Sequence, residues 1–146
     1  MPDISKFFST EEKSKIVEAI KHAELNTSGE IRLHLENRCK KDALDRATYI
    51  FEKLKMHKTE LRNGVLFYLA VKDQKFAILG DAGINAKVPD NFWDNIKEHM
   101  LSNFKEGKYS AGLEEGIKMT GEQLKKHFPY QSDDVNELSD EISFGK

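Results

Sequence analysis

Three side chains with oxygen donors stand at the ends of apolar segments of the chain: Glu30, Asn63 and Asp81. Asp81 follows the apolar run FAIL and is flanked by two glycines in the sequence GDAG. Carboxylate and amide oxygens are the ligands that hard cations such as Ca²⁺ and Mg²⁺ prefer. These residue types therefore indicate a divalent-cation site or acid–base chemistry, on condition that the fold brings them together.

A guanidinium lies beside these oxygen donors. Arg62 directly precedes Asn63 and can pair with a carboxylate or bind a phosphate bidentately. The alternative is an ordinary structural role, in which Asp81 and Asn63 are turn residues and Glu30 forms a surface ion pair with Arg62. Towards the end of the chain, Glu137 and Asp140 offer further oxygens, although an acidic run is more often a solvated tail.

Helical and strand periodicities alternate along the chain and predict the elements that position these side chains. Ser9 and Glu12 form a capping box ahead of a helix over residues 10–25. Strict alternation over residues 30–36 predicts a half-exposed strand with His34 on its solvated face. Two more strands are expected at residues 65–71 and 76–79, and three more helices at residues 41–55, after an N-cap at Asp90, and at residues 110–127.

The order of these elements fixes a topology. A βαβ unit makes the first two strands parallel, and the short connection at residues 72–75 makes the third strand antiparallel to the second. The start of the first strand, the start of the second and the end of the third then share one sheet edge, where Glu30, Asn63 and Asp81 meet. We expect an α/β fold, a three-layer α/β/α sandwich with a small mixed β-sheet. One domain spans residues 1–128, and an acidic tail at residues 129–146 is either partly disordered or packed back on it.

Composition excludes several classes of function. The 146 residues carry 23 basic and 25 acidic side chains, without the clustered basic excess that marks a nucleic-acid-binding protein. The longest apolar run, residues 65–71, is far short of the roughly 20 residues of a membrane helix, and the N-terminus lacks a signal-peptide pattern. Cys39 is the single cysteine, so no intrachain disulfide can form. We expect a cytoplasmic monomer that neither enters a membrane nor binds nucleic acid.

Several segments, taken in order, resemble one protein family. TSGEIRLHLE, LRNGVLFYLAV, ILGDAGI, FW, and HFP followed by NELSDE are similar to the TPM domain, whose members include a thylakoid lumen acid phosphatase. The similarity runs over residues 7–144 and is strongest to the small members without a membrane anchor. It implies an α/β/α sandwich, divalent-metal binding at an acidic loop cluster, and phosphatase activity in some members.

Two functions follow as hypotheses. In the first, Asp81 and Glu30 hold Ca²⁺ or Mg²⁺, and the protein is a metal-dependent phosphatase acting on phosphomonoesters. The cation polarises a phosphoryl oxygen or activates a water, and Arg62 neutralises charge on the phosphate. In the second, the cation orders the loops of a non-enzymatic module that binds a protein partner. A plain interaction domain without metal is a third alternative. The candidate ligands are Asp81, Glu30 and Asn63, with Glu137 and Asp140 from the tail.

Overall fold

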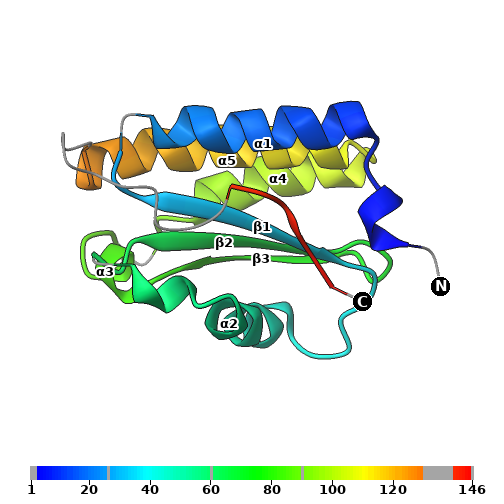
Figure 1. The fold of residues 1–146 in the computed structure, drawn as a ribbon, viewed down its shortest axis with the longest axis horizontal. Coiled ribbons are helices and arrows are strands. Elements are labelled where there is room, and N and C mark those ends of the chain that lie inside the picture. The colour runs from blue at the N-terminus through cyan, green and yellow to red at the C-terminus, as the bar shows by residue number, and fades with distance from the viewer. Residues whose placement is uncertain (1–2, 26, 60, 90, 130–139, 146) are drawn as a thin grey trace.

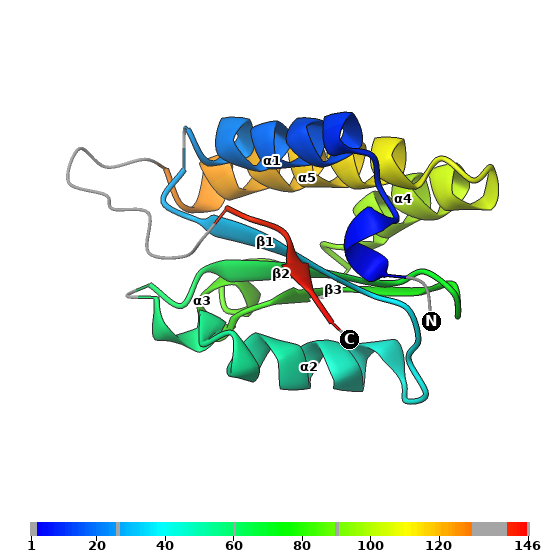
Figure 2. The same ribbon diagram turned by 45° about the vertical axis from the view of Figure 1, so that its right-hand side comes forward.

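A four-stranded mixed sheet lies between two layers of helices (Figures 1 and 2). The computed structural model describes residues 3–25, 27–59, 61–89, 91–129 and 140–145. Helices α1 (Thr10–Glu24), α4 (Asp94–Lys105) and α5 (Tyr109–His127) cover one face of the sheet, and α2 (Ala43–Lys53) covers the other. The predicted three-layer sandwich is confirmed.

The sheet has the strand order β3-β2-β1-β4. Its strands are β1 (Glu30–Glu36), β2 (Gly64–Ala70), β3 (Lys75–Gly80) and β4 (Ser143–Phe144). As predicted, β1 and β2 run parallel and β2 and β3 antiparallel. The edge strand β4 runs parallel to β1 and was not predicted, because two residues are too few to show a period.

Two apolar cores hold the layers together. The larger core lies under α1, α4 and α5, where Ile16 and Ile20 of α1 are fully buried. The capping box that begins α1 is confirmed, since Ser9 Oγ accepts a hydrogen bond from the backbone N–H of Glu12. The smaller core lies under α2 and includes Ile50 and Tyr68.

The prediction that β1 is half exposed is wrong. His34 is only 4% exposed and Glu36 only 2%, because α2 and β4 cover the face that the alternation assigned to solvent. Polar residues on that face find partners from these neighbouring elements instead of water.

The helix boundaries also differ in places. Helix α4 begins at Asp94 rather than directly after Asp90, which lies outside the described residues. A four-residue helix, α3 (Ala82–Asn85), and two short 3-10 helices, Ile4–Lys6 and Met56–Lys58, were not predicted. None of the helices in the described part of the chain combines the length and apolar composition needed to cross a bilayer.

Candidate functional site

The expected sheet edge forms as predicted. Glu30 is in register with Gly64, and the backbone N–H of Glu30 donates to the carbonyl of Asn63 at 3.2 Å. On the other side of β2, Asp81 N–H donates to the carbonyl of Gly64 at 3.0 Å. The segments that carry Glu30, Asn63 and Asp81 therefore meet at one end of the sheet.

Asp81 and Arg62 form a bidentate ion pair at this edge. Arg62 Nε donates to Asp81 Oδ2 and Arg62 Nη2 donates to Asp81 Oδ1, both at 2.8 Å. Asp81 Oδ1 also accepts the backbone N–H of Ala82 at 2.7 Å and so caps α3. The Asp81 hydrogen bonds raise the pKa of Arg62. Both carboxylate oxygens of Asp81 are thus already engaged by donors within the chain.

Asn63 is buried and ties two loops together. Its side-chain Nδ2 donates to the carbonyl of Ser28 at 3.1 Å, and its backbone N–H donates to Thr59 Oγ1 at 3.3 Å. The Asn63 side chain therefore fastens the start of β1 to the segment that leads into β2.

Two other carboxyl groups lie beside Glu30. This acidic cluster consists of Glu24 at the end of α1, Glu30 at the start of β1, and Asp140 from the C-terminal end of the chain. Burial raises the pKa of Glu24 to about 9, and a hydrogen bond with Asp140 and the negative charges of Asp140 and Glu30 act in the same direction. Glu24 Oε2 also accepts the backbone N–H of Ile31 at 2.8 Å. Glu24 is therefore protonated near neutral pH.

Sequence reasoning missed Glu24. One local signal existed, because an acidic side chain in the last turn of a helix faces the negative end of the helix dipole. Glu24 occupies that place in α1, which ends one residue before Leu25. What the sequence does not reveal is that Asp140, far along the chain, meets it there.

The structure thus divides the predicted site residues into two groups. Glu30 and Asp140 lie together in the acidic cluster, whereas Asp81 and Arg62 bind each other. Asn63 belongs to neither group, because its side chain binds the backbone of Ser28. Glu137 lies outside the described residues. Over the described ranges, no three His, Cys, Asp or Glu side chains are already arranged to hold a metal ion.

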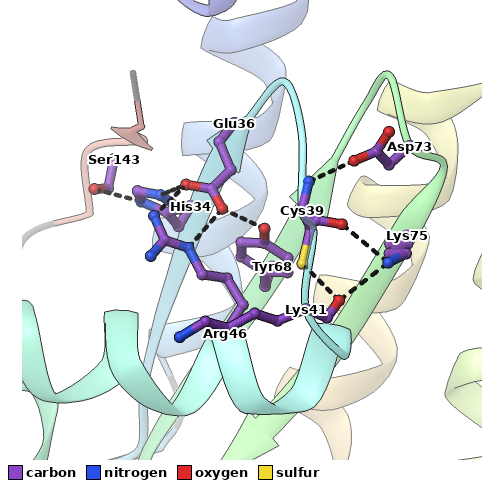
Figure 3. A network of polar contacts seen from close by, with 9 residues as sticks. All are labelled: His34, Glu36, Cys39, Lys41, Arg46, Tyr68, Asp73, Lys75 and Ser143. Atoms are coloured by element: carbon purple, nitrogen blue, oxygen red, sulfur yellow. Dashed lines mark hydrogen bonds and ion pairs between the residues drawn. The ribbon is translucent and has the colours of Figure 1, made fainter.

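A second polar network is buried between β1, α2 and β4 (Figure 3). Glu36 lies at its centre: Arg46 Nε donates to Glu36 Oε2 at 2.8 Å and Arg46 Nη2 to Oε1 at 3.0 Å, while the Tyr68 hydroxyl also donates to Oε2. His34 Nε2 is 3.3 Å from Glu36 Oε1, and His34 Nδ1 is 2.9 Å from Ser143 Oγ.

This network sets the charge of Glu36. Burial alone would raise the pKa of Glu36, but hydrogen bonds from His34, Arg46 and Tyr68 outweigh it and lower the pKa to about 2. The pKa of Tyr68 is raised, first by burial and then by its bond to Glu36. Glu36 is therefore an ionised carboxylate under all ordinary conditions, fixed in place by donors from three elements.

The loop that follows β1 is clamped to the β2–β3 turn (Figure 3). Cys39 N–H donates to Asp73 Oδ2 at 2.7 Å, and Lys75 Nζ donates to the carbonyls of Cys39 and Lys41 at 2.9 and 3.0 Å. The thiol of Cys39 is buried, with its Sγ 3.2 Å from the Lys41 carbonyl. These contacts give the Cys39 region a structural role.

Comparison with known proteins places the chain in a family. The TPM domain matches residues 1–123. Among solved structures, the BA42 protein from the psychrophilic bacterium Bizionia argentinensis is 48% identical, with a TM-score of 0.92, over 99% of this chain and 100% of that one. The comparison with curated proteins gives no match.

Two more distant structures share the fold. The N-terminal domain of a P. gingivalis protein is 17% identical with a TM-score of 0.69, covering 85% of this chain and 80% of its own. The N-terminal domain of the cg2496 protein from Corynebacterium glutamicum is 10% identical with a TM-score of 0.65, covering 100% of this chain and 90% of its own.

Proposed function

The chain belongs to the TPM domain family, and from that premise we propose that it binds a divalent cation, Ca²⁺ or Mg²⁺, at the acidic cluster. The observation that carries the proposal is the contact between the carboxyl groups of Glu24 and Asp140 with Glu30 beside them. Burial is the main reason that Glu24 retains a proton, and the hydrogen bond with Asp140 and the negative charges of Asp140 and Glu30 add to it. A divalent cation would replace that proton and neutralise the remaining charge.

The donor chemistry of the cluster fits a hard cation. Its side chains offer only carboxylate oxygens, which suit Ca²⁺ and Mg²⁺ rather than softer metals. Asp81 fits less well, because Arg62 and the N–H of Ala82 already occupy its oxygens. Asp81 would become a ligand only if Arg62 released it, so we propose Glu24 rather than Asp81 as a cation ligand.

The role of the cation is that of an ordering ligand in a non-enzymatic interaction module. This alternative is favoured over catalysis because Arg62, the predicted phosphate contact, directs its guanidinium at Asp81. A bound cation would supply Lewis-acid polarisation of a phosphoryl oxygen if the protein were a phosphatase. Arg62 is nevertheless about half exposed, with 49% of its side-chain surface accessible. Phosphatase activity would therefore require the substrate phosphate to displace Asp81 from Arg62.

A titration of three chains with CaCl₂ and MgCl₂ tests the cation site. We expect wild type to bind by calorimetry and to melt at a higher temperature than in EDTA, since a ligand at 100 times its Kd stabilises by about 2.7 kcal/mol. Glu24→Gln keeps an acceptor for Ile31 N–H and should lose at least tenfold in affinity, whereas the matched control Asp81→Asn should keep wild-type affinity. No metal-dependent shift in wild type would overturn the proposal. If only Asp81→Asn lost metal affinity, the cation site would lie at Asp81 instead of at the acidic cluster.

A second assay separates the module from the phosphatase. We expect no hydrolysis of p-nitrophenyl phosphate above the level of buffer containing the same metal. Metal-dependent turnover that disappears in Arg62→Gln would instead establish a phosphatase that uses Arg62. The two assays are independent, because cation binding is read by heat and melting temperature and not by activity.

A further inference from the structure

We infer that residues 140–145, the C-terminal strap, couple the acidic cluster to the buried network around His34, so that cation binding and docking of β4 support each other. This inference rests on the proposed cation site. The strap carries Asp140 at one end and β4 with Gly145 at the other, and it lies along β1 in both views of the fold (Figures 1 and 2).

The backbone register links the two ends. Ser143 is paired with His34 and Phe144 with Leu35, and the N–H of Gly145 donates to the Leu35 carbonyl at 2.7 Å. Only two residues, with a bend at Glu141, separate Asp140 from Ser143, and the Asp140 carboxyl group meets Glu24 at the end of α1. Docking of β4 sets the position of Asp140.

Strand β4 docks on a surface, here called the seat, that is formed by the side chains of His34, Glu36, Arg46 and Tyr68. Ser143 Oγ lies 2.9 Å from His34 Nδ1, and the opposite ring nitrogen of His34 faces Glu36. Glu36 in turn is held by Arg46 of α2 and Tyr68 of β2 (Figure 3). All of these side chains except Ser143 belong to β1, α2 and β2. The surface on which the strap docks is therefore formed by other elements of the fold.

The seat also requires a glycine at position 145. A Cβ atom added to Gly145 would lie 2.4 Å from Glu36 Oε1 and 2.7 Å from Glu36 Cβ. Glu36 cannot yield without breaking its bonds to Arg46 and Tyr68. A larger residue at position 145 should therefore expel the strap while leaving the acidic side chains unchanged.

The two sites are then thermodynamically linked. If the cation uses Asp140, it binds the docked strap more tightly than the released strap, and docking must raise cation affinity by the same factor. Coupling between two sites typically changes affinity 5- to 150-fold. Short pairing over two residues makes the strap the part of the sheet most able to respond to this coupling.

Gly145→Val in the full chain tests the coupling, with Phe144→Leu as the matched control, since Phe144 is on the same strand and 38% exposed. Amide hydrogen exchange at residue 145 and the His34 ring resonances report docking, and calorimetry reports Ca²⁺ affinity. In Gly145→Val we expect at least tenfold faster exchange and about tenfold weaker Ca²⁺ binding. Phe144→Leu should match wild type, and Ca²⁺ should slow exchange at residue 145 in wild type.

The outcomes distinguish this inference from the cation proposal. A released strap in Gly145→Val with wild-type Ca²⁺ affinity would overturn the coupling and leave the cation site standing. If the strap stayed docked in that variant, the claim that docking requires glycine at position 145 would be wrong. Absence of Ca²⁺ and Mg²⁺ binding by wild type would overturn both. If Gly145→Val fails to fold, Ser143→Ala removes only the contact with His34 and should show the same two effects with smaller amplitude.

Discussion

Arg62 and Asp81 are joined by two parallel hydrogen bonds of 2.8 Å, and Asp81 is at the same time the N-cap of α3. Asp81 thereby connects the segment before β2 to α3, the short helix that follows β3. Its carboxylate has a structural task at the sheet edge before any ligand is considered.

The double role of Asp81 predicts unequal effects at the two ends of the ion pair. Asp81→Ala removes the cap of α3 as well as the partner of Arg62, and it should destabilise the protein by about 1–2 kcal/mol. Arg62→Gln leaves the cap intact, and because the Arg62 side chain is half exposed its effect should be smaller and should fade with added salt. Urea denaturation at low and high NaCl measures both. Equal losses in the two variants would contradict this account.

Glu24 predicts a stability that falls as the pH rises. Its pKa is raised from 4.5 to about 9, so between these values the unfolded chain releases a proton that the folded chain retains. The free energy of unfolding contributed by Glu24 is complete below pH 4.5 and is lost as the pH rises towards 9, at up to about 1.4 kcal/mol per pH unit. In EDTA, Glu24→Gln should therefore be more stable than wild type at pH 8, and this advantage should vanish near pH 4.

Urea denaturation at pH 4, 6 and 8 checks the Glu24 prediction. Added Ca²⁺ should narrow the difference at pH 8, because wild type binds the cation more tightly and gains more stability from it. A constant difference between the two chains at all three pH values would show that Glu24 does not titrate in this range.

Glu36 predicts the opposite pH dependence. Its pKa is lowered from 4.5 to about 2, so its stabilisation is present above pH 4.5 and is lost as the pH falls towards 2. Glu36→Gln should cost about 3 kcal/mol at pH 7, since removing one partner leaves Arg46 without its counter-charge. Chemical denaturation at pH 7 and pH 2.5 should show this deficit shrinking in acid. Glu98→Gln, an exposed change on α4, serves as the control and should have little effect.

Two glycines at the same sheet edge should respond differently to alanine. A Cβ at Gly83 would lie 2.1 Å from the backbone oxygen of Leu61, whereas a Cβ at Gly29 would meet the tip of the Leu124 side chain at 2.9 Å. Backbone cannot move aside as a side chain can, so Gly83→Ala should destabilise by about 3 kcal/mol and Gly29→Ala by about 1 kcal/mol. Thermal melting of both variants tests the ranking, and a larger loss at Gly29 would refute it.

The order of elements and the strand pairing were predictable because they depend on local patterns. Alternation over residues 30–36 located β1, and the βαβ rule with a short hairpin placed the three main strands. The meeting of the segments that carry Glu30, Asn63 and Asp81 followed from that topology alone.

The partners of individual polar side chains were not predictable, because they come from distant elements. Alternation assigns His34 to one face of β1, but it does not reveal that Ser143 and Arg46 cover that face. In the same way, Glu24 has an unremarkable place in the sequence until the strap brings Asp140 to it. A period of two or 3.6 residues identifies a face, whereas the neighbours of that face are fixed by tertiary packing.

Strand β4 has one more consequence for β1. A strand at the border of a sheet presents free N–H and C=O groups to any extended chain that approaches, which is a common route to aggregation. Ser143 and Phe144 occupy that border with residues of the same chain. Expelling the strap would therefore do more than open the acidic cluster: it would leave a template on which molecules could stack edge to edge.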